Sequence, residues 1–260
     1  MTARASALAR MAGAHRLLVA VDFDGTLSPL ENEPMAARML PAARDAVTAL
    51  TALPRTWVAL VSGRSMSDLR VIAEHRDGSP ILLAGSHGAE YWTPDDGAVE
   101  PDEDPADIVL RDRLRAAAQE ATRHLPGVFI EPKTFGFGVH TRRASAADAR
   151  TADDAVDALV AAGAPHWRRR TGHNIVEYAF RDEGKDTAVR HLRDLTGADT
   201  VLFAGDDLTD EDALRSLPAG DVGVHVGAGQ ATAATVVVPD IPAFAAFLDE
   251  LVTLRAAAAQ

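Results

Sequence analysis

One short apolar run in this chain is followed at once by two carboxylates. The run Leu17–Val21 has the length and the unbroken hydrophobicity of a strand buried inside a parallel sheet. Asp22 and Asp24 come next, and alternate residues of an extended chain leave it on the same side. Gly25 then allows a sharp turn. Two like charges at the end of a buried strand raise each other's pKa or need a cation between them, so the pattern indicates chemistry at this strand end.

Length and charge limit the number of domains and the classes of partner that the chain can have. With 260 residues, 47% of them apolar, the chain can form one large domain or two small ones with a full core. Lys and Arg number 26 against 38 Asp and Glu, and this net charge of −12 argues against nucleic-acid and anionic-membrane partners. A phosphorylated small molecule stays possible, because a metal and a few local cations can reverse the field inside a cleft. The chain has no cysteine, so thiolate zinc sites and a cysteine nucleophile are excluded. We expect a cytoplasmic protein, with a monomer favoured.

The first and last parts of the chain alternate between strands and helices. This alternation predicts a parallel sheet covered by helices. In the first part we expect strands at 17–21, 57–61 and 81–84 and helices at 41–53 and 65–74. In the last part we expect helices at 185–195, 209–217 and 241–255 and strands at 201–204, 222–226 and 236–238.

The middle of the chain has a different pattern, bounded by predicted linkers at 94–105 and 181–184. Between them we expect a helix at 106–124, strands at 128–131 and 135–141, a helix at 145–162, and strands at 166–170 and 174–180. This αββαββ repeat predicts a small α+β module with an antiparallel sheet. The predicted fold is therefore α/β, with a doubly wound, Rossmann-like core of residues 1–102 and 183–260. The smaller α+β cap of residues 103–182 is inserted into it on two hinges and can close over a site at the strand ends.

Four side chains near predicted strand and helix ends suit a displacement reaction. Asp22 is a candidate nucleophile, and Asp24 is placed to protonate a leaving oxygen and later to activate water. Ser62 follows the strand at 57–61, where its hydroxyl can hold a phosphate oxygen, although helix capping by Ser62 or Ser65 is the simpler explanation. Lys185 begins a helix, where a cation opposes the macrodipole. Lys185 therefore has one of two explanations: it neutralises a bound phosphate or nearby acids, or it is a tolerated surface lysine.

A second apolar strand, at 201–204, also ends in acids. Asp206 and Asp207 are hard oxygen ligands without a neighbouring His or Cys, which suits Mg²⁺ rather than zinc. Thr209 and Asp212 resemble a capping pair, which does not account for Asp206 and Asp207. Spacing alone favours structural or solvated roles for the remaining candidates, which are His87, His140 and Arg168–Arg170.

Taken in order, these segments resemble the haloacid dehalogenase superfamily of phosphohydrolases, and more closely the trehalose-6-phosphate phosphatases. The similarity rests on DFDGTLSPL at 22–30, SGR at 62–64, GSHGAE at 85–90, EPKTFGFGVHTR at 131–142 and GDDLTDED at 205–212. The resemblance implies that Asp22 is the nucleophile and a Mg²⁺ ligand. It also implies that Asp24 is the general acid/base and gives its backbone carbonyl to the metal. The other implied core roles are phosphoryl contacts from Ser62 and Lys185 and metal ligation by Asp206, supported by Asp207 and Asp210.

The same resemblance extends to the substrate. It implies sugar contacts in the cap from Glu131, Lys133, His140, Arg142 and Glu177. It places Arg64 and His87 at the mouth of the site. The chain departs from the family pattern at Thr141, at Asp186 and at Tyr178–Phe180. These departures bear on sugar specificity rather than on the phosphoryl chemistry.

The resulting hypothesis is Mg²⁺-dependent hydrolysis of trehalose 6-phosphate through an aspartyl-phosphate, in trehalose biosynthesis, with a small-molecule sugar phosphate as partner. One alternative is the same chemistry on sucrose 6-phosphate, a glucosyl- or mannosyl-glycerate phosphate, or a pseudo-disaccharide phosphate. A phosphomutase is a further alternative. A non-catalytic sugar-phosphate sensor is disfavoured, because Asp22, Asp24, Asp206 and Lys185 are all present.

Overall fold

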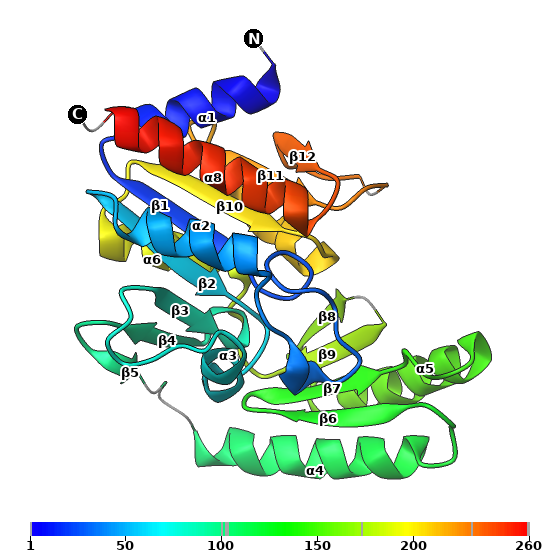
Figure 1. The fold of residues 1–260 in the computed structure, drawn as a ribbon. Coiled ribbons are helices and arrows are strands. Elements are labelled where there is room, and N and C mark those ends of the chain that lie inside the picture. The colour runs from blue at the N-terminus through cyan, green and yellow to red at the C-terminus, as the bar shows by residue number, and fades with distance from the viewer. Residues whose placement is uncertain (1, 100, 102–103, 173, 230, 259–260) are drawn as a thin grey trace. The chain divides into compact units, whose positions relative to one another are not determined.

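The computed structural model describes residues 2–99, 101, 104–172, 174–229 and 231–258 (Figure 1). The chain forms two compact units. The first, called the core unit below, comprises Met1–Glu100 and Glu183–Gln260. The second, called the inserted unit, is Pro101–Asp182. Among the described residues, no helix combines the length and the apolar character needed to cross a bilayer.

The core unit is built on one eight-stranded sheet with the order β12-β11-β10-β1-β2-β3-β4-β5. From β12 to β3 the strands are parallel, and β4 and β5 extend the edge in antiparallel fashion. Because β1 pairs with β2 on one side and with β10 on the other, the strand order reverses at β1, which is where ligands bind in open α/β sheets. The strands are β1 (Leu17–Asp22), β2 (Thr56–Val61), β3 (Leu82–Gly85), β4 (Glu90–Thr93), β5 (Gly97–Val99), β10 (Thr200–Gly205), β11 (Val222–Val226) and β12 (Val236–Val238).

Helices cover both faces of this sheet. Strand β1 is buried throughout because its alternate side chains enter two different cores. Leu17 and Val19 join the core under α1 (Ala3–Gly13), α2 (Pro41–Thr51), α3 (Met66–Ile72) and α8 (Ile241–Ala258). Leu18 and Ala20 join the core under α6 (Lys185–Thr196) and α7 (Glu211–Ser216). Three short 3₁₀ turns complete the unit: η1 (Pro34–Ala36), η2 (Ser86–Gly88) and η3 (Leu208–Asp210).

The inserted unit has its own antiparallel sheet, in the order β6-β7-β9-β8. Its elements are α4 (Pro105–Thr122), β6 (Phe129–Lys133), β7 (Gly136–His140), α5 (Ala146–Gly163), β8 (Arg168–Gly172) and β9 (Ile175–Ala179). Ile130, Val139 and Val176 pack against α4 and α5 in a separate hydrophobic core. Their neighbours along each strand therefore lie on the opposite side of the sheet, called the open face below.

The predicted α/β class and the αββαββ order of the inserted unit are confirmed, with four local differences. The antiparallel edge strand β4 was not predicted. Helix α1 forms in the Ala-rich start of the chain, capped by Thr2, whose hydroxyl accepts the N–H of Ala5 at 3.2 Å. The predicted linker at 94–105 is partly wrong, since β5 lies within it and pairs at the sheet edge with β4. Three residues are too few to show a hydrophobic period. The predicted helix at 209–217 begins as the 3₁₀ turn η3 because Asp207 and Asp210 form its capping pair.

Candidate active site

The carboxyl ends of β1 and β10 bring distant acids together. Asp22 is the last residue of β1, and Asp206 directly follows β10. Because the two strands are parallel neighbours, these ends meet at the same edge of the sheet. One carboxylate oxygen from each of Asp22, Asp206 and Asp210 lies within 4.8 Å of the others. We call these three residues the acidic cluster.

Lys185 supplies the acidic cluster with a buried cation. Its Nζ donates to Asp22 Oδ1 at 2.6 Å and to Asp210 Oδ1 at 2.7 Å. The three side chains are only 4%, 6% and 0% exposed, so these ion pairs are shielded from water. The helix dipole disfavours a cation at the start of α6. The two carboxylates that Lys185 contacts explain why a lysine nevertheless stands there.

One lysine does not balance three acids. Burial raises the pKa of Asp22 well above its usual value, and the Asp210 and Asp206 carboxylates add to this rise while Lys185 opposes it. Burial, reinforced by Asp210, likewise raises the pKa of Asp206 to about 7. For Lys185, burial alone would lower the pKa, but Asp210 and Asp22 outweigh it and raise the pKa, so the lysine stays charged. The cluster as it stands favours a further cation, and its oxygen donors suit Mg²⁺.

Two glycines make this close packing possible. A Cβ at Gly25, which has a φ of +86°, would lie 2.0 Å from Asp206 Oδ2. A Cβ at Gly205 would lie 2.1 Å from Asp210 Cγ. Both positions therefore exclude any side chain. Thr26 also holds Asp206, since its hydroxyl donates to Asp206 Oδ1 at 3.1 Å.

Asp210 rather than Asp207 completes the acidic cluster. Asp210 Oδ2 accepts the backbone N–H groups of Asp206 and Asp207 at 3.1 and 3.0 Å. The Asp207 carboxylate instead accepts the N–H of Leu208 at 2.7 Å and caps η3. Among the described residues, Asp207 is therefore not part of the three-acid group, although the sequence suggested it as a metal ligand.

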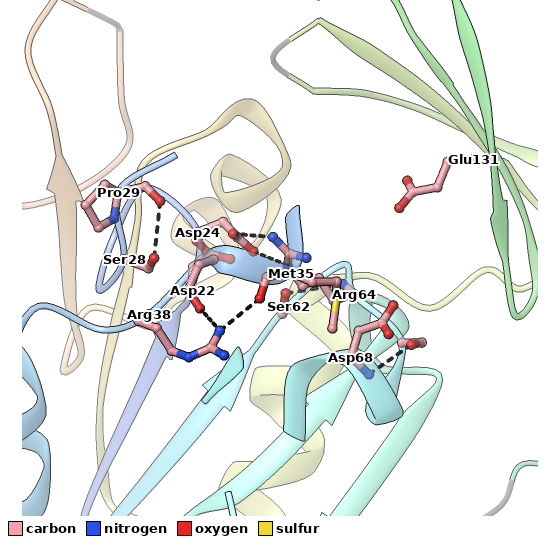
Figure 2. Close-up of polar contacts among 12 residues, drawn as sticks. Asp22, Asp24, Ser28, Pro29, Met35, Arg38, Ser62, Arg64, Asp68 and Glu131 are labelled. Atoms are coloured by element: carbon pink, nitrogen blue, oxygen red, sulfur yellow. Dashed lines mark hydrogen bonds and ion pairs between the residues drawn. The ribbon is translucent and has the colours of Figure 1, made fainter. Parts of the chain in front are cut away.

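Asp24 lies in a bidentate ion pair (Figure 2). Arg64 Nε donates to its Oδ2 at 2.6 Å, and Arg64 Nη2 donates to its Oδ1 at 2.7 Å. The Asp24 and Arg64 side chains are 24% and 17% exposed. Arg64, expected at the mouth of the site, is thus in direct contact with the candidate acid/base.

Ser62 and His87 meet at the carboxyl end of β2. Ser62 is buried, and its hydroxyl accepts the N–H of Arg64 at 3.2 Å. Of the two serines considered as helix caps from the sequence, Ser65 is the one that caps α3. The backbone N–H of His87 donates to the Ser62 carbonyl at 2.9 Å. A Cβ at Gly63 would lie 2.6 Å from the His87 ring, so the imidazole packs directly on this turn. His87 has a φ of +58°, a strained conformation that its sequence neighbourhood gives no sign of.

In the inserted unit, a second lysine bridges two acids on the open face. Lys133 Nζ lies 2.9 Å from Glu131 Oε2 and 3.1 Å from Glu177 Oε1. His140 Nε2 lies 2.8 Å from the same Glu131 oxygen. Burial alone would raise the pKa of Glu131, but His140 and Lys133 lower it to about 2. Arg142 is exposed just beyond the end of β7.

Strand register places a glycine between the two acids of this second group. Glu131 pairs with Gly138, and Gly138 pairs with Glu177, so the two acids flank a residue without a side chain. Burial would lower the pKa of Lys133, but Glu177 and Glu131 raise it, so the lysine stays charged. The open face thus offers charged donors and acceptors around a glycine, an arrangement suited to hydroxyl groups. We call Glu131, Lys133, His140 and Glu177 the open-face cluster.

The doubly wound core with an inserted α+β unit is a haloacid dehalogenase-like fold. Within this class, the family model for trehalose-phosphatase matches residues 20–238, and the chain belongs to that family.

Individual relatives agree with this assignment. The chain is 37% identical over 255 residues to a trehalose-phosphate phosphatase of Mycobacterium avium, covering 92% of this chain and 62% of that protein. The C-terminal domain of Candida albicans trehalose-6-phosphate phosphatase has the same fold, with a TM-score of 0.82, 21% identity and 96% of each chain covered. Aspergillus fumigatus trehalose-6-phosphate phosphatase gives a TM-score of 0.68 at 25% identity, covering 96% of this chain and 97% of that one. The chain thus spans about three-fifths of the length of the mycobacterial relative.

Proposed function

We propose that this chain hydrolyses trehalose 6-phosphate to trehalose and phosphate. The observation that carries the proposal is the buried group at the carboxyl ends of β1 and β10, in which Lys185 bridges Asp22 and Asp210 beside Asp206. Membership of the trehalose-phosphatase family and the names of the relatives support the choice of substrate.

In the first step, one Asp22 oxygen attacks the phosphorus while the other stays hydrogen-bonded to Lys185. The bond between phosphorus and the sugar oxygen breaks, and Asp24 gives its proton to that oxygen, which releases the sugar. Ser62 and Lys185 hold oxygens of the phosphoryl group. In the second step, Asp24 takes a proton from water, which attacks the phosphorus. The bond between Asp22 and phosphorus then breaks, and phosphate leaves.

The acidic cluster would hold Mg²⁺ together with the backbone carbonyl of Asp24. A bound Mg²⁺ neutralises charge on the phosphoryl oxygens. The fit rests on the donor set, which is all oxygen, and on the surplus of acids over Lys185. Asp207 then acts indirectly, by capping the turn that carries Asp210.

Arg64 controls when Asp24 is available. In this arrangement both Asp24 oxygens are engaged as acceptors of hydrogen bonds from the guanidinium. The ion pair therefore opens in each turnover before Asp24 protonates the leaving oxygen. His87 fixes the turn that carries Ser62 and Arg64 through its hydrogen bond to the Ser62 carbonyl.

The open-face cluster would bind the sugar. Carboxylates and a lysine offer acceptors and donors to the hydroxyl groups of a disaccharide, and Gly138, without a side chain, lies between the two carboxylate residues. Arg142 would add a donor from beyond the end of β7. These five side chains make the substrate-binding set of the proposal.

Phosphate release from a panel of sugar phosphates tests the substrate. The panel contains trehalose 6-phosphate, sucrose 6-phosphate, a glucosyl-glycerate phosphate and glucose 6-phosphate, each with Mg²⁺. We expect kcat/KM for trehalose 6-phosphate to exceed each of the others by about 10²-fold or more, since a site built to pair hydroxyl groups rejects ligands that leave its polar groups unpaired. A higher kcat/KM for another sugar phosphate contradicts the proposal.

The Asp22→Asn variant tests the nucleophile. We expect kcat to fall by about 10⁴-fold or more, as for removal of a covalent nucleophile in other enzymes. Asp45→Asn is the matched control, because Asp45 is an exposed aspartate of α2. Parent-level phosphate release by Asp22→Asn would remove the aspartyl-phosphate from the mechanism.

A further inference from the structure

A buried acid and a buried imidazole lie behind the acidic cluster. Glu211 directly follows Asp210 as the first residue of α7 and is 1% exposed. His225, on β11, is 2% exposed and stands in register with Gly205, the residue before Asp206. Glu211 Oε1 and His225 Nδ1 are 4.0 Å apart. The proposed chemistry uses neither residue.

Both facing atoms lack a hydrogen bond. Within the described residues, Glu211 Oε1 and His225 Nδ1 are buried side-chain atoms without a hydrogen-bond partner. Buried polar groups are nearly always paired, so two orphan atoms that face each other need a common explanation. A carboxylate oxygen accepts and an imidazole nitrogen can donate, and a shift of less than 1 Å brings them into hydrogen-bond range.

The second oxygen of Glu211 is already in use. Glu211 Oε2 accepts the backbone N–H of Ala233 at 2.9 Å. The backbone N–H of Thr235 in turn donates to the Gly223 carbonyl on β11 at 3.0 Å. Glu211 therefore joins the loop of the acidic cluster to the segment before β12, and that segment is itself hydrogen-bonded to β11. The ion pair with Arg215, at 3.7 Å, is peripheral because the Arg215 side chain is 60% exposed.

We propose that Glu211 and His225 act together as positioning residues that fix the loop carrying Asp206 and Asp210 and so set its affinity for Mg²⁺. The identity of the cation as Mg²⁺ rests on the proposed function. Outer partners that orient metal-binding groups elsewhere change metal affinity by about 10–100-fold when they are lost. Here the pair acts through the backbone, since Asp210 holds the N–H groups of Asp206 and Asp207.

The test is calorimetric titration of Mg²⁺ into the metal-free, full-length protein without substrate. We expect Glu211→Gln and His225→Leu each to raise the Kd for Mg²⁺ by about tenfold. The double variant should show the same loss as either single variant, because the two residues act as one unit. His225→Asn keeps a donor near the Nδ1 position and should restore most of the affinity. Asp212→Asn is the matched surface control, since its side chain is 53% exposed, and should leave the Kd unchanged.

Three results would overturn the inference. The first is a Kd within twofold of the parent value with a lower Tm of the metal-free variants, which marks a purely structural pair. The second is full additivity in the double variant. The third is no rescue by His225→Asn. Failure of the proposed function is recognised separately, by a parent protein that binds Mg²⁺ in the titration and yet does not release phosphate from trehalose 6-phosphate.

Discussion

The two units of this protein each place a lysine between two carboxylates, and the two arrangements differ in burial and in charge balance. Lys185 in the core unit bridges Asp22 and Asp210 at 2.6 and 2.7 Å, with the three side chains at most 6% exposed. Lys133 in the inserted unit bridges Glu131 and Glu177 at 2.9 and 3.1 Å, with side chains 13–27% exposed.

The difference agrees with the proposal that one group binds a cation and the other binds a sugar. In the core unit, Asp206 is a third acid beside a single lysine, and the pKa of Asp22 and of Asp206 is raised by burial. In the inserted unit, His140 joins Lys133 beside Glu131, and the pKa of Glu131 is lowered to about 2 despite burial. The first group sets three acids against one lysine, whereas the second sets two acids against one lysine and a histidine. The second group offers hydrogen-bond donors and acceptors to hydroxyl groups.

Replacing each lysine by methionine tests the comparison most strongly. In Lys185→Met, two buried carboxylates lose their partner, and we expect kcat to fall by about 10³-fold. The free energy of unfolding should fall by about 3–5 kcal/mol without metal, as for a broken buried ion pair.

In Lys133→Met, we expect KM for trehalose 6-phosphate to rise about tenfold with kcat nearly unchanged, since one charged hydrogen bond to substrate is worth about 1.5 kcal/mol. Steady-state kinetics and urea unfolding measure both. Equal loss of kcat in the two variants would abolish the distinction.

Binding of Mg²⁺ should stabilise the protein through the core unit and not through the inserted unit. At 100 times its Kd, Mg²⁺ should raise the free energy of unfolding by about 2.7 kcal/mol. We expect Asp206→Asn to remove most of this gain and Glu131→Gln to retain it. Thermal melts with Mg²⁺ and with EDTA provide the measurement. An unchanged response in Asp206→Asn would place the metal elsewhere, and phosphate release that persists in excess EDTA would argue against a metal altogether.

The open-face cluster should make stability depend on acid pH. The Glu131 carboxyl has a lower pKa in the folded protein, about 2, than its usual 4.5, so the folded state favours the charged form. Its contribution is therefore complete above pH 4.5 and is lost as the pH falls through about 2. We expect this contribution to be about 2 kcal/mol after allowance for partial exposure, and Glu131→Gln should lack it. Urea unfolding of both proteins between pH 2 and pH 6 measures the difference. Parallel stability curves for the two proteins would contradict the assignment.

The smallest expected effect comes from adding a methyl group at Gly138. This methyl group would lie 3.0 Å from Ile175 Cδ1 and 3.5 Å from Glu131 Oε2. We expect Gly138→Ala to raise KM about fivefold and to leave kcat unchanged, because one added methylene at a binding surface costs about 1 kcal/mol. Gly220→Ala is the control, since nothing lies within 4 Å of the added carbon. Kinetics on trehalose 6-phosphate decide the outcome, and a fall in kcat alone would move Gly138 out of the binding surface.

Much of the core unit could be predicted because its signals are local. Strand β1 and the acids after it form one continuous pattern, and so do β10 and Asp206. The position of Asp210 could not be predicted in this way. It enters the acidic cluster because η3 turns its carboxylate back onto the N–H groups of Asp206 and Asp207. That geometry depends on a 3₁₀ turn that acidic spacing alone does not distinguish from the start of an α-helix.

The inserted unit shows a second limit. Alternation along β6 places Glu131 and Lys133 on one face, which the sequence alone indicates. The register between β7 and β9 then places Glu177 beside Gly138, and register depends on pairing between distant segments. The contact between Glu211 and His225 could not be predicted for a related reason, because the two residues come from different elements and the sequence shows only an isolated histidine.

The strand order also determines when each sheet can form during synthesis of the chain. Strand β1 leaves the ribosome early, but its neighbour β10 begins only at Thr200, after the whole inserted unit has been synthesised. All strand pairs of the inserted unit lie between Phe129 and Ala179. Its sheet can therefore form while one edge of β1 is still open, and the core sheet closes last. A nascent chain that stalls before residue 200 exposes one open edge of β1, in which every residue before Asp22 is apolar, so the interval between the synthesis of β1 and of β10 is when the protein most needs protection from aggregation.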